Sequence, residues 1–216
     1  MWVSYIIDKK SGVIDLKHIF IKGNGKSDIT LLLLHGTGGR ETDLLHVAAT
    51  VDQNANVLAY RGDVLEGEQS RYFKRFDLKR FDEESLKTES EKLYNQILED
   101  SEKYDFDLKR TVIIGYSNGA NIAAHMLLNH DTEFLGAMLM HPGYFSEQVG
   151  DVNLGHMNVL LIAGARDTLT TAGEAYKLKQ KLEAKGAKAE VKLTDGGHEI
   201  DMMEPMEGHV WLLGIK

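Results

Sequence analysis

The sequence predicts an α/β fold in which a mostly parallel sheet carries helices on both faces. Short apolar runs alternate with longer segments whose apolar residues recur at helical spacing. Some of the short runs, such as DITLLLLHG (28–36), are apolar at almost every position, as expected for a strand covered on both faces. This alternation favours crossover connections between neighbouring strands, and therefore a parallel sheet.

The first half of the chain opens with LKHIFIKG (16–23), whose alternating pattern predicts a half-exposed edge strand. Residues 61–82 show no clear periodicity and are predicted to be irregular. The other predicted elements of this half are a strand at 28–36, a helix at 42–51, a strand at 55–62 and a long surface helix at 82–104.

The second half repeats the order of strand and helix. It predicts a strand at 110–117, a helix at 118–130, strands at 134–143 and 158–167, a helix at 171–186, a strand at 187–197 and a terminal helix from about 202. Thr171 and Glu174 have the spacing of a capping box, and Gly186 is a helix stop. Because we find neither a repeat nor a linker, residues 1–216 are predicted to form a single domain.

Composition excludes several functional classes. The formal net charge of −8 argues against binding to nucleic acid, and we interpret RYFKRFDLKR (71–80) as a solvated loop or a pocket rim. The absence of cysteine excludes disulfides, thiolate nucleophiles and cysteine metal sites. No apolar run is long enough to span a membrane, and residues 1–12 do not read as a signal peptide, so we expect a cytoplasmic protein without a membrane partner.

GYSNG (115–119) joins a predicted buried strand to a predicted helix, and it places Ser117 between Gly115 and Gly119. This is the G-x-S-x-G pattern of a nucleophile elbow, in which strained backbone lifts a serine hydroxyl above the sheet. Side chains at the two glycine positions would collide with the neighbouring strand and helix. The alternative is an ordinary helix N-cap serine. The context favours a nucleophile.

A serine needs a base to act as a nucleophile at neutral pH. His198 follows the last predicted strand, and Asp167 ends the strand at 158–167, so both should lie at the same sheet edge as Ser117. His198 would accept the serine proton, and Asp167 would orient the imidazole. Asp195 and Asp201 are closer to His198 in sequence, but neither follows a strand as Asp167 does.

HGTGG (35–39) follows a buried strand and offers unobstructed main-chain donors. We expect the amides of Thr37 and Asn118 to form an oxyanion hole, with Gly36 and Gly38 close to the substrate. The glycine spacing does not match a nucleotide-binding loop, and HEIDM (198–202) lacks the second histidine of a zinc protease. We therefore expect neither a metal nor a cofactor.

Candidates for the substrate pocket come from two places. Tyr72, Phe73 and Phe76 lie in the irregular segment that must cross the catalytic edge of the sheet. They could line a pocket or equally anchor the loop to the core. His141 ends a predicted strand and is a further candidate, although a satisfied core histidine is the more favoured interpretation.

With these pieces in place, the chain resembles the phospholipase/carboxylesterase branch of the α/β-hydrolases, which includes the acyl-protein thioesterases. Its motifs are most similar to those of small bacterial hydrolases linked to hydroquinone stress. The resemblance runs from about residue 28 to the C-terminus through LLLLHGTGGRETDLL, GYSNGANIAA, HPG, GARDTLT and GGHEI. It implies a hydrolase with little or no cap domain, which acts on short carboxylic esters or thioesters without a cofactor.

Two positions depart from the better-studied thioesterases. Gly39 stands where their HGxGD loop has an acidic residue, and Asn118 replaces a glutamine. Main-chain donors survive both changes, but substrate preference does not transfer. The sequence therefore predicts a serine hydrolase whose partner is a small-molecule ester. A thioesterase, a lysophospholipase, a non-catalytic binding homologue and a homodimer all stay open.

Overall fold

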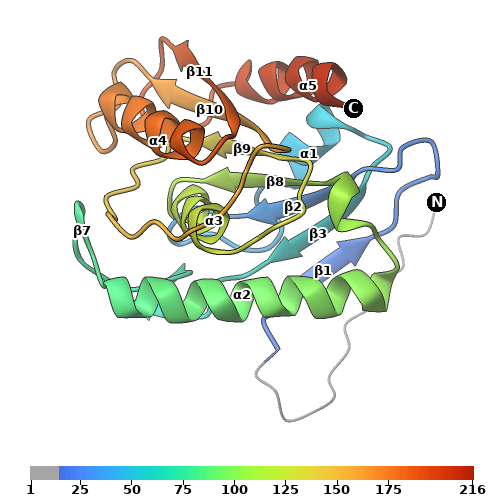
Figure 1. The fold of residues 1–216 in the computed structure, drawn as a ribbon, viewed down its shortest axis with the longest axis horizontal. Helices are drawn as coiled ribbons and strands as arrows, with labels where there is room; N and C mark the ends of the chain where they lie inside the picture. The colour runs from blue at the N-terminus through green and yellow to red at the C-terminus, as the bar shows by residue number, and fades with distance from the viewer. Residues whose placement is uncertain (1–14) are drawn as a thin grey trace.

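The computed structural model describes residues 15–216, so the N-terminal segment that we searched for a signal peptide lies outside the described residues. Its centre is a seven-stranded sheet (Figure 1). The strands are, in spatial order, β1 (His18–Ile21), β3 (Asn56–Tyr60), β2 (Thr30–Leu34), β8 (Thr111–Tyr116), β9 (Gly136–Met140), β10 (Asn158–Gly164) and β11 (Lys188–Thr194). Only β1 at one edge pairs antiparallel, and the predicted mostly parallel sheet is confirmed.

Helices cover both faces of the sheet. One face carries α2 (Glu83–Tyr104), α3 (Asn118–Asn129) and α4 (Ala172–Ala184), and the other carries α1 (Leu45–Val51) and α5 (Glu204–Ile215). Strand β2 shows why its sequence is continuously apolar: Leu32 and Leu34 pack under the first set of helices, and Leu31 and Leu33 under the second. Within the described residues, no helix is long and apolar enough to cross a membrane.

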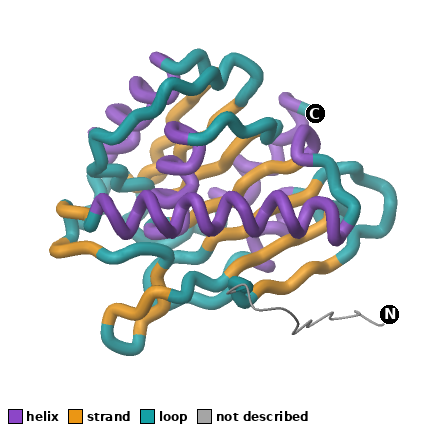
Figure 2. The backbone as a smooth tube through the Cα atoms, turned by 60° about the horizontal axis from the view of Figure 1, so that its bottom comes forward, coloured by secondary structure: helices purple, strands orange, loops and turns teal. Residues whose placement is uncertain are grey.

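The segment between β3 and α2 is more ordered than its sequence predicts. It forms two short hairpins, β4 (Val64–Glu66) with β5 (Gln69–Arg71) and β6 (Arg75–Asp77) with β7 (Arg80–Phe81). Figure 2 shows both hairpins near the start of α2. Strands of two or three residues are too short for their periodicity to be read from sequence, which explains the wrong prediction. A short 3₁₀ helix at Leu108–Arg110 leads into β8.

The helix ends differ in how they are capped. Asp82 precedes α2 and accepts a hydrogen bond from the Ser85 amide over 3.0 Å. Thr171 precedes α4 as predicted, but its side chain makes no capping hydrogen bond. Glu174 instead pairs with Lys177 Nζ at 3.2 Å, so the predicted capping box does not form. Gly186, at φ +95°, follows the end of α4 as expected.

This difference predicts the stability of two variants. Asp82→Ala should lower the free energy of unfolding by about 1 kcal/mol, because an α2 amide loses its acceptor. Thr171→Ala is the matched control: it occupies the same position on α4 without a side-chain bond, and should cost clearly less. Urea unfolding of both variants measures the difference. Equal losses would show that the Asp82 cap contributes nothing specific.

Candidate active site

Ser117 lies at the apex of the turn between β8 and α3, and its backbone has φ +50° and ψ −109°. Both flanking glycines are required sterically. A Cβ on Gly119 would lie 2.1 Å from the Leu34 carbonyl oxygen of β2, and one on Gly115 would lie 2.8 Å from Ala120 Cα in α3. A side chain at either glycine would therefore collide with a strand or a helix, as predicted. The turn has the geometry of a nucleophile elbow.

Three loops at the carboxyl edge of the sheet bring Ser117, Asp167 and His198 together. They follow β8, β10 and β11 respectively. Ser117 Oγ lies 2.8 Å from His198 Nε2, and His198 Nδ1 lies 2.7 Å from Asp167 Oδ2. These partners correspond to a serine that donates to Nε2 and an Nδ1–H that donates to the carboxylate. The chain thus has the hydrogen-bond sequence of a nucleophile, a base and an orienting acid.

Within the described residues, neither Asp195 nor Asp201 makes a hydrogen bond to the His198 ring. The Asp201 carboxylate accepts a hydrogen bond from the Met203 amide at the start of α5. The main-chain oxygen of Asp195 accepts one from Arg166 Nε over 2.5 Å. Asp167 holds the imidazole instead, because a strand end brings it to the same edge of the sheet.

Neutral donors surround the Asp167 carboxylate. Its Oδ1 accepts from the Leu169 amide at 2.8 Å and the Thr170 amide at 2.9 Å, and its Oδ2 accepts from Thr170 Oγ1 at 2.8 Å. Burial opposes ionisation, but the hydrogen bonds from Thr170, His198 and Leu169 outweigh it and hold the pKa of Asp167 below its usual value. Sequence analysis missed Thr170, although its hydroxyl follows Asp167 at a spacing that permits a local hydrogen bond.

Tyr116, the residue directly before Ser117, holds the main chain of His198 in place. Its hydroxyl donates to the His198 carbonyl oxygen over 2.8 Å. Burial, with the nearby carboxylate of Asp167, raises the pKa of Tyr116 to about 12, so the phenol stays a neutral donor. Sequence analysis also missed this residue, because only the partner 82 positions away gives it a role.

His141 does not line the pocket, which corrects its prediction as a substrate contact. It is 1% exposed, and its Nε2 lies 3.1 Å from both carboxylate oxygens of Glu204. Among the described residues, its Nδ1 has no hydrogen-bond partner, and this atom lies 3.5 Å from Asp167 Oδ2. Glu204 itself is fully buried at the start of α5. The His141 ring also lies close to that of His198, with 5.5 Å between their centroids.

One group of donors in the described residues has the proximity that a metal would require. The ligand atoms of His141, Asp167 and His198 lie within 4.8 Å of one another. Two of these residues, Asp167 and His198, already share a hydrogen bond. A cation there would have to displace that bond, so the arrangement fits a proton-handling chain better than a metal centre.

Thr37 and Asn118 line the same cavity as Ser117. Within the part of the chain that the structure describes, neither main-chain amide donates a hydrogen bond to a protein acceptor. Their side chains are held in place: Thr37 Oγ1 accepts from Arg71 Nη1 at 2.6 Å, and Asn118 Oδ1 accepts from the Tyr72 amide at 2.8 Å. Two fixed amides are therefore available beside Ser117.

The two glycines around Thr37 shape this loop and do not line the cavity. A Cβ on Gly36 would lie 2.7 Å from the Tyr116 ring, so the loop packs directly on that ring. Gly38 has φ +77° and donates its amide to the Ser70 carbonyl oxygen over 2.8 Å. The prediction that Gly36 and Gly38 contact the substrate is replaced by a role in loop conformation.

The cavity at Ser117 has a volume of about 200 Å³. It is lined by Thr37, Arg71, Arg75, Leu78, Phe81, Tyr116, Ser117, Asn118, Asn121, Phe145, Leu169, Thr170 and His198. Ligand pockets commonly measure about 300–1,000 Å³, so this cavity suits a small molecule. The segment at 61–82 borders the cavity, but it does so with residues other than the predicted aromatics.

Those aromatics have other positions. The Tyr72 hydroxyl donates to the Tyr60 carbonyl oxygen over 2.8 Å, and Phe73 packs edge-on against Phe81 in the core. Phe76 is 66% exposed, with the Arg80 guanidinium over its ring. Tyr72 and Phe73 are therefore loop anchors, which was the alternative interpretation, and Phe76 is a surface residue.

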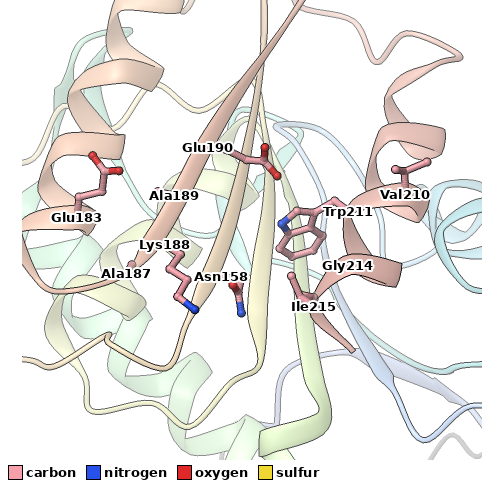
Figure 3. Close-up of a pocket in the computed structure, with 10 residues that line it drawn as sticks. All are labelled: Asn158, Glu183, Ala187, Lys188, Ala189, Glu190, Val210, Trp211, Gly214 and Ile215. Atoms are coloured by element: carbon pink, nitrogen blue, oxygen red, sulfur yellow. The ribbon is translucent and has the colours of Figure 1, made fainter.

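A larger hollow of about 580 Å³ lies at the other edge of the sheet (Figure 3). Asn158 and Lys188, which begin β10 and β11, form its wall together with Trp211 and Ile215 of α5. Among the described residues that line it, there is neither a serine nor a histidine. Of these two cavities, the smaller one therefore combines a nucleophile with a base.

Comparison with known proteins identifies the family. A family model described as Phospholipase/Carboxylesterase matches residues 17–211. The chain belongs to the phospholipase/carboxylesterase family. This confirms the resemblance predicted from GYSNG and the other motifs.

Similar proteins match almost the whole chain. MhqD of Bacillus subtilis, a protein named as a hydrolase, is 39% identical over 196 residues, which are 91% of this chain and 97% of MhqD. The Bacillus cereus carboxylesterase structure has 38% identity and a TM-score of 0.90 over 94% of this chain and 96% of its own. YahD, solved with malic acid, has 30% identity and a TM-score of 0.87, and the match covers 93% of this chain and 100% of YahD. The predicted α/β-hydrolase fold is confirmed.

The elbow predicts a strong effect of one added methyl group. Gly119→Ala should lower the free energy of unfolding by about 3 kcal/mol, because its Cβ would meet the backbone of β2, which cannot move aside. Gly214→Ala in α5 is the control: its Cβ would meet no atom of the described residues within 4 Å, and the stability should be unchanged or rise by up to about 1 kcal/mol. Denaturant unfolding of both variants tests this. Similar stabilities would contradict the steric explanation.

The Asp167 environment predicts a pH-dependent effect of Thr170. Thr170→Val removes a hydrogen bond to a buried carboxylate and should cost about 1–3 kcal/mol at pH 7. Because the folded pKa of Asp167 is lowered, its stabilisation is complete above the unfolded value of 3.8 and is lost as the pH falls through the folded value. The difference between wild type and Thr170→Val should therefore shrink below about pH 4.

Unfolding by urea at several pH values measures this dependence. Thr171→Val is the control, because the Thr171 side chain makes no capping bond and lies next to Thr170 in sequence. A loss of stability in Thr170→Val that stays constant from pH 7 to below pH 4 would show that the hydroxyl does not act through the charge of Asp167.

Proposed function

We propose that the protein is a serine esterase that cleaves small carboxylic esters through an acyl-enzyme. The observation that carries the proposal is the contact of 2.8 Å between Ser117 Oγ and His198 Nε2, at a serine held at φ +50°. Family membership supports hydrolysis of an ester as the reaction class. The roles of the individual residues are inferred from their geometry.

In the first half of the reaction, Ser117 Oγ attacks the ester carbonyl carbon while its proton passes to His198 Nε2. The Asp167 carboxylate, 2.7 Å from Nδ1, stabilises the imidazolium that forms. The carbon–oxygen bond to the leaving group then breaks, and His198 returns the proton to that oxygen. The alcohol departs, and the acyl group stays on Ser117.

In the second half, water attacks the acyl carbon and gives its proton to His198. The bond to Ser117 Oγ breaks, the serine regains its proton and the carboxylic acid leaves. Negative charge develops on the carbonyl oxygen in both halves. The unoccupied amides of Thr37 and Asn118 are suited to stabilise it, and the N-terminus of α3 adds a favourable dipole.

Replacement of the nucleophile is the direct test. Ser117→Ala should reduce the hydrolysis of p-nitrophenyl acetate to background, because among residues 15–216 only the Ser117 hydroxyl contacts His198 Nε2. The Thr170 hydroxyl lies 3.4 Å from Nδ1 and donates to Asp167. The loss should be on the order of 10⁴-fold or more. Circular dichroism and unfolding must show that the variant stays folded. Turnover retained by folded Ser117→Ala would discard the mechanism.

Covalent labelling separates an enzyme from a non-catalytic binding homologue. A fluorophosphonate probe should label wild type at Ser117, as identified by peptide mass spectrometry, and should not label His198→Gln at a comparable rate. A panel of esters, thioesters and lysophospholipids then assigns the substrate class, because the same acyl-enzyme chemistry serves all three.

A further inference from the structure

Two arginines form part of the wall of the Ser117 cavity. Arg71 ends β5 and Arg75 begins β6, so the connection between the two hairpins carries both side chains to the same site. Among residues 15–216, the lining of this cavity contains no aspartate, glutamate or lysine. Its other side chains are neutral polar or apolar, apart from the imidazole of His198. The two guanidinium groups are thus the permanent charges in contact with this space.

Arg71 is unusual because its guanidinium is buried. The residue is 2% exposed, and burial, reinforced by the charge of Arg75, lowers its pKa to about 10. It is still protonated at neutral pH. A buried charge is costly unless it is paired and hydrogen-bonded. The Arg71 charge is buried in the wall of the cavity that holds Ser117. Its position there indicates a role in binding a ligand.

The protein satisfies only part of the Arg71 side chain. Its Nε lies 3.2 Å from both the Phe73 carbonyl oxygen and Glu66 Oε2, and its Nη1 donates to Thr37 Oγ1 at 2.6 Å. Among residues 15–216, no protein acceptor contacts Nη2. A guanidinium has five N–H donors, so several are left for a ligand in the cavity.

Within residues 15–216, both arginines pair with one carboxylate, that of Glu66. Glu66 Oε2 lies 3.2 Å from Arg71 Nε and 3.0 Å from Arg75 Nε, and Glu66 Oε1 accepts from Arg75 Nη2 at 3.0 Å. Two guanidinium groups and one carboxylate leave one uncompensated positive charge. Glu66 is not among the residues that line the cavity, so the negative charge lies outside it.

We propose that the cavity binds esters whose acyl part carries a second, ionised carboxylate, and that Arg71 and Arg75 bind this group. The inference rests on the esterase function proposed above and adds its substrate class. One uncompensated charge matches a monoanion. The planar fork of a guanidinium matches the two oxygens of a carboxylate.

The sheet order assigns the carboxylate to the acyl part. Thr37, which contacts Arg71, follows β2 on one side of β8, whereas His198 follows β11 on the other side. The leaving alcohol must receive its proton from His198, so it lies on the β11 side of Ser117. The acyl chain then extends toward the arginines on the β2 side.

Two ethyl esters of matched shape test the preference. Monoethyl succinate ends its acyl chain in a carboxylate, and ethyl 4-methylpentanoate replaces the two carboxylate oxygens with methyl groups. A pH-indicator assay of acid release gives kcat/KM for each. Wild type should prefer monoethyl succinate by about tenfold or more, the range of a charge-assisted hydrogen bond.

Variants of the arginines assign the preference to its residues. Arg75→Gln should lower the ratio of the two kcat/KM values by about tenfold, and Arg75→Lys should lower it less, because the charge is kept without the fork. Arg80→Gln is the matched control. Arg80 lies on the adjacent β7, its side chain is 71% exposed, and it pairs with Asp77 outside the cavity lining. Arg80→Gln removes the same charge as Arg75→Gln, but it should keep the wild-type ratio of the two kcat/KM values.

Several results would overturn the inference. One is a wild type that hydrolyses both esters equally well, and another is a ratio that changes equally in Arg75→Gln and Arg80→Gln. Either result would show that the arginines connect the two hairpins structurally and do not bind the substrate. Preference for 3-(4-methylpentanoyloxy)propanoate, whose carboxylate lies in the alcohol part, would overturn the acyl assignment. Ser117-dependent hydrolysis of neutral esters without anionic preference would reject only this inference, whereas no Ser117-dependent hydrolysis would reject the esterase itself.

Discussion

Ser117 keeps a positive φ between β8 and α3, a conformation that typically costs an L-residue about 1–3 kcal/mol. The surrounding packing maintains it. Gly115 lets α3 approach the end of β8, and Gly119 lets the same helix lie against the Leu34 carbonyl of β2. Because these contacts set where the serine hydroxyl points, the contact with His198 and the position of the cavity both depend on them.

The acid of the site is stabilised from two sides. Neutral donors from Thr170 and the following turn keep the Asp167 carboxylate ionised despite its burial. Behind it lies a buried histidine, His141, whose other nitrogen faces the fully buried carboxylate of Glu204. Buried polar groups next to the site therefore extend from Asp167 through His141 to Glu204 of α5.

The sheet and the hairpins supply different parts of the site. Loops at the carboxyl ends of parallel strands supply the serine, the acid and the base, which is where this type of fold gathers ligands. The two hairpins between β3 and α2 supply the charged wall with Arg71 and Arg75. Sequence changes in those hairpins can therefore alter what the cavity accepts, while the elbow and the parallel sheet stay unchanged.

Local sequence pattern determined the order of the main strands and helices, and the three residues that meet at the sheet edge, because parallel strands bring their carboxyl ends to one place. Only the tertiary structure decided what lines the cavity. Hairpin strands of two or three residues carry no readable period, yet they direct Tyr72 and Phe73 into the core and Arg71 to the cavity. His141 likewise owes its buried position to Glu204, 63 residues away, and such long-range pairings leave no mark in local sequence.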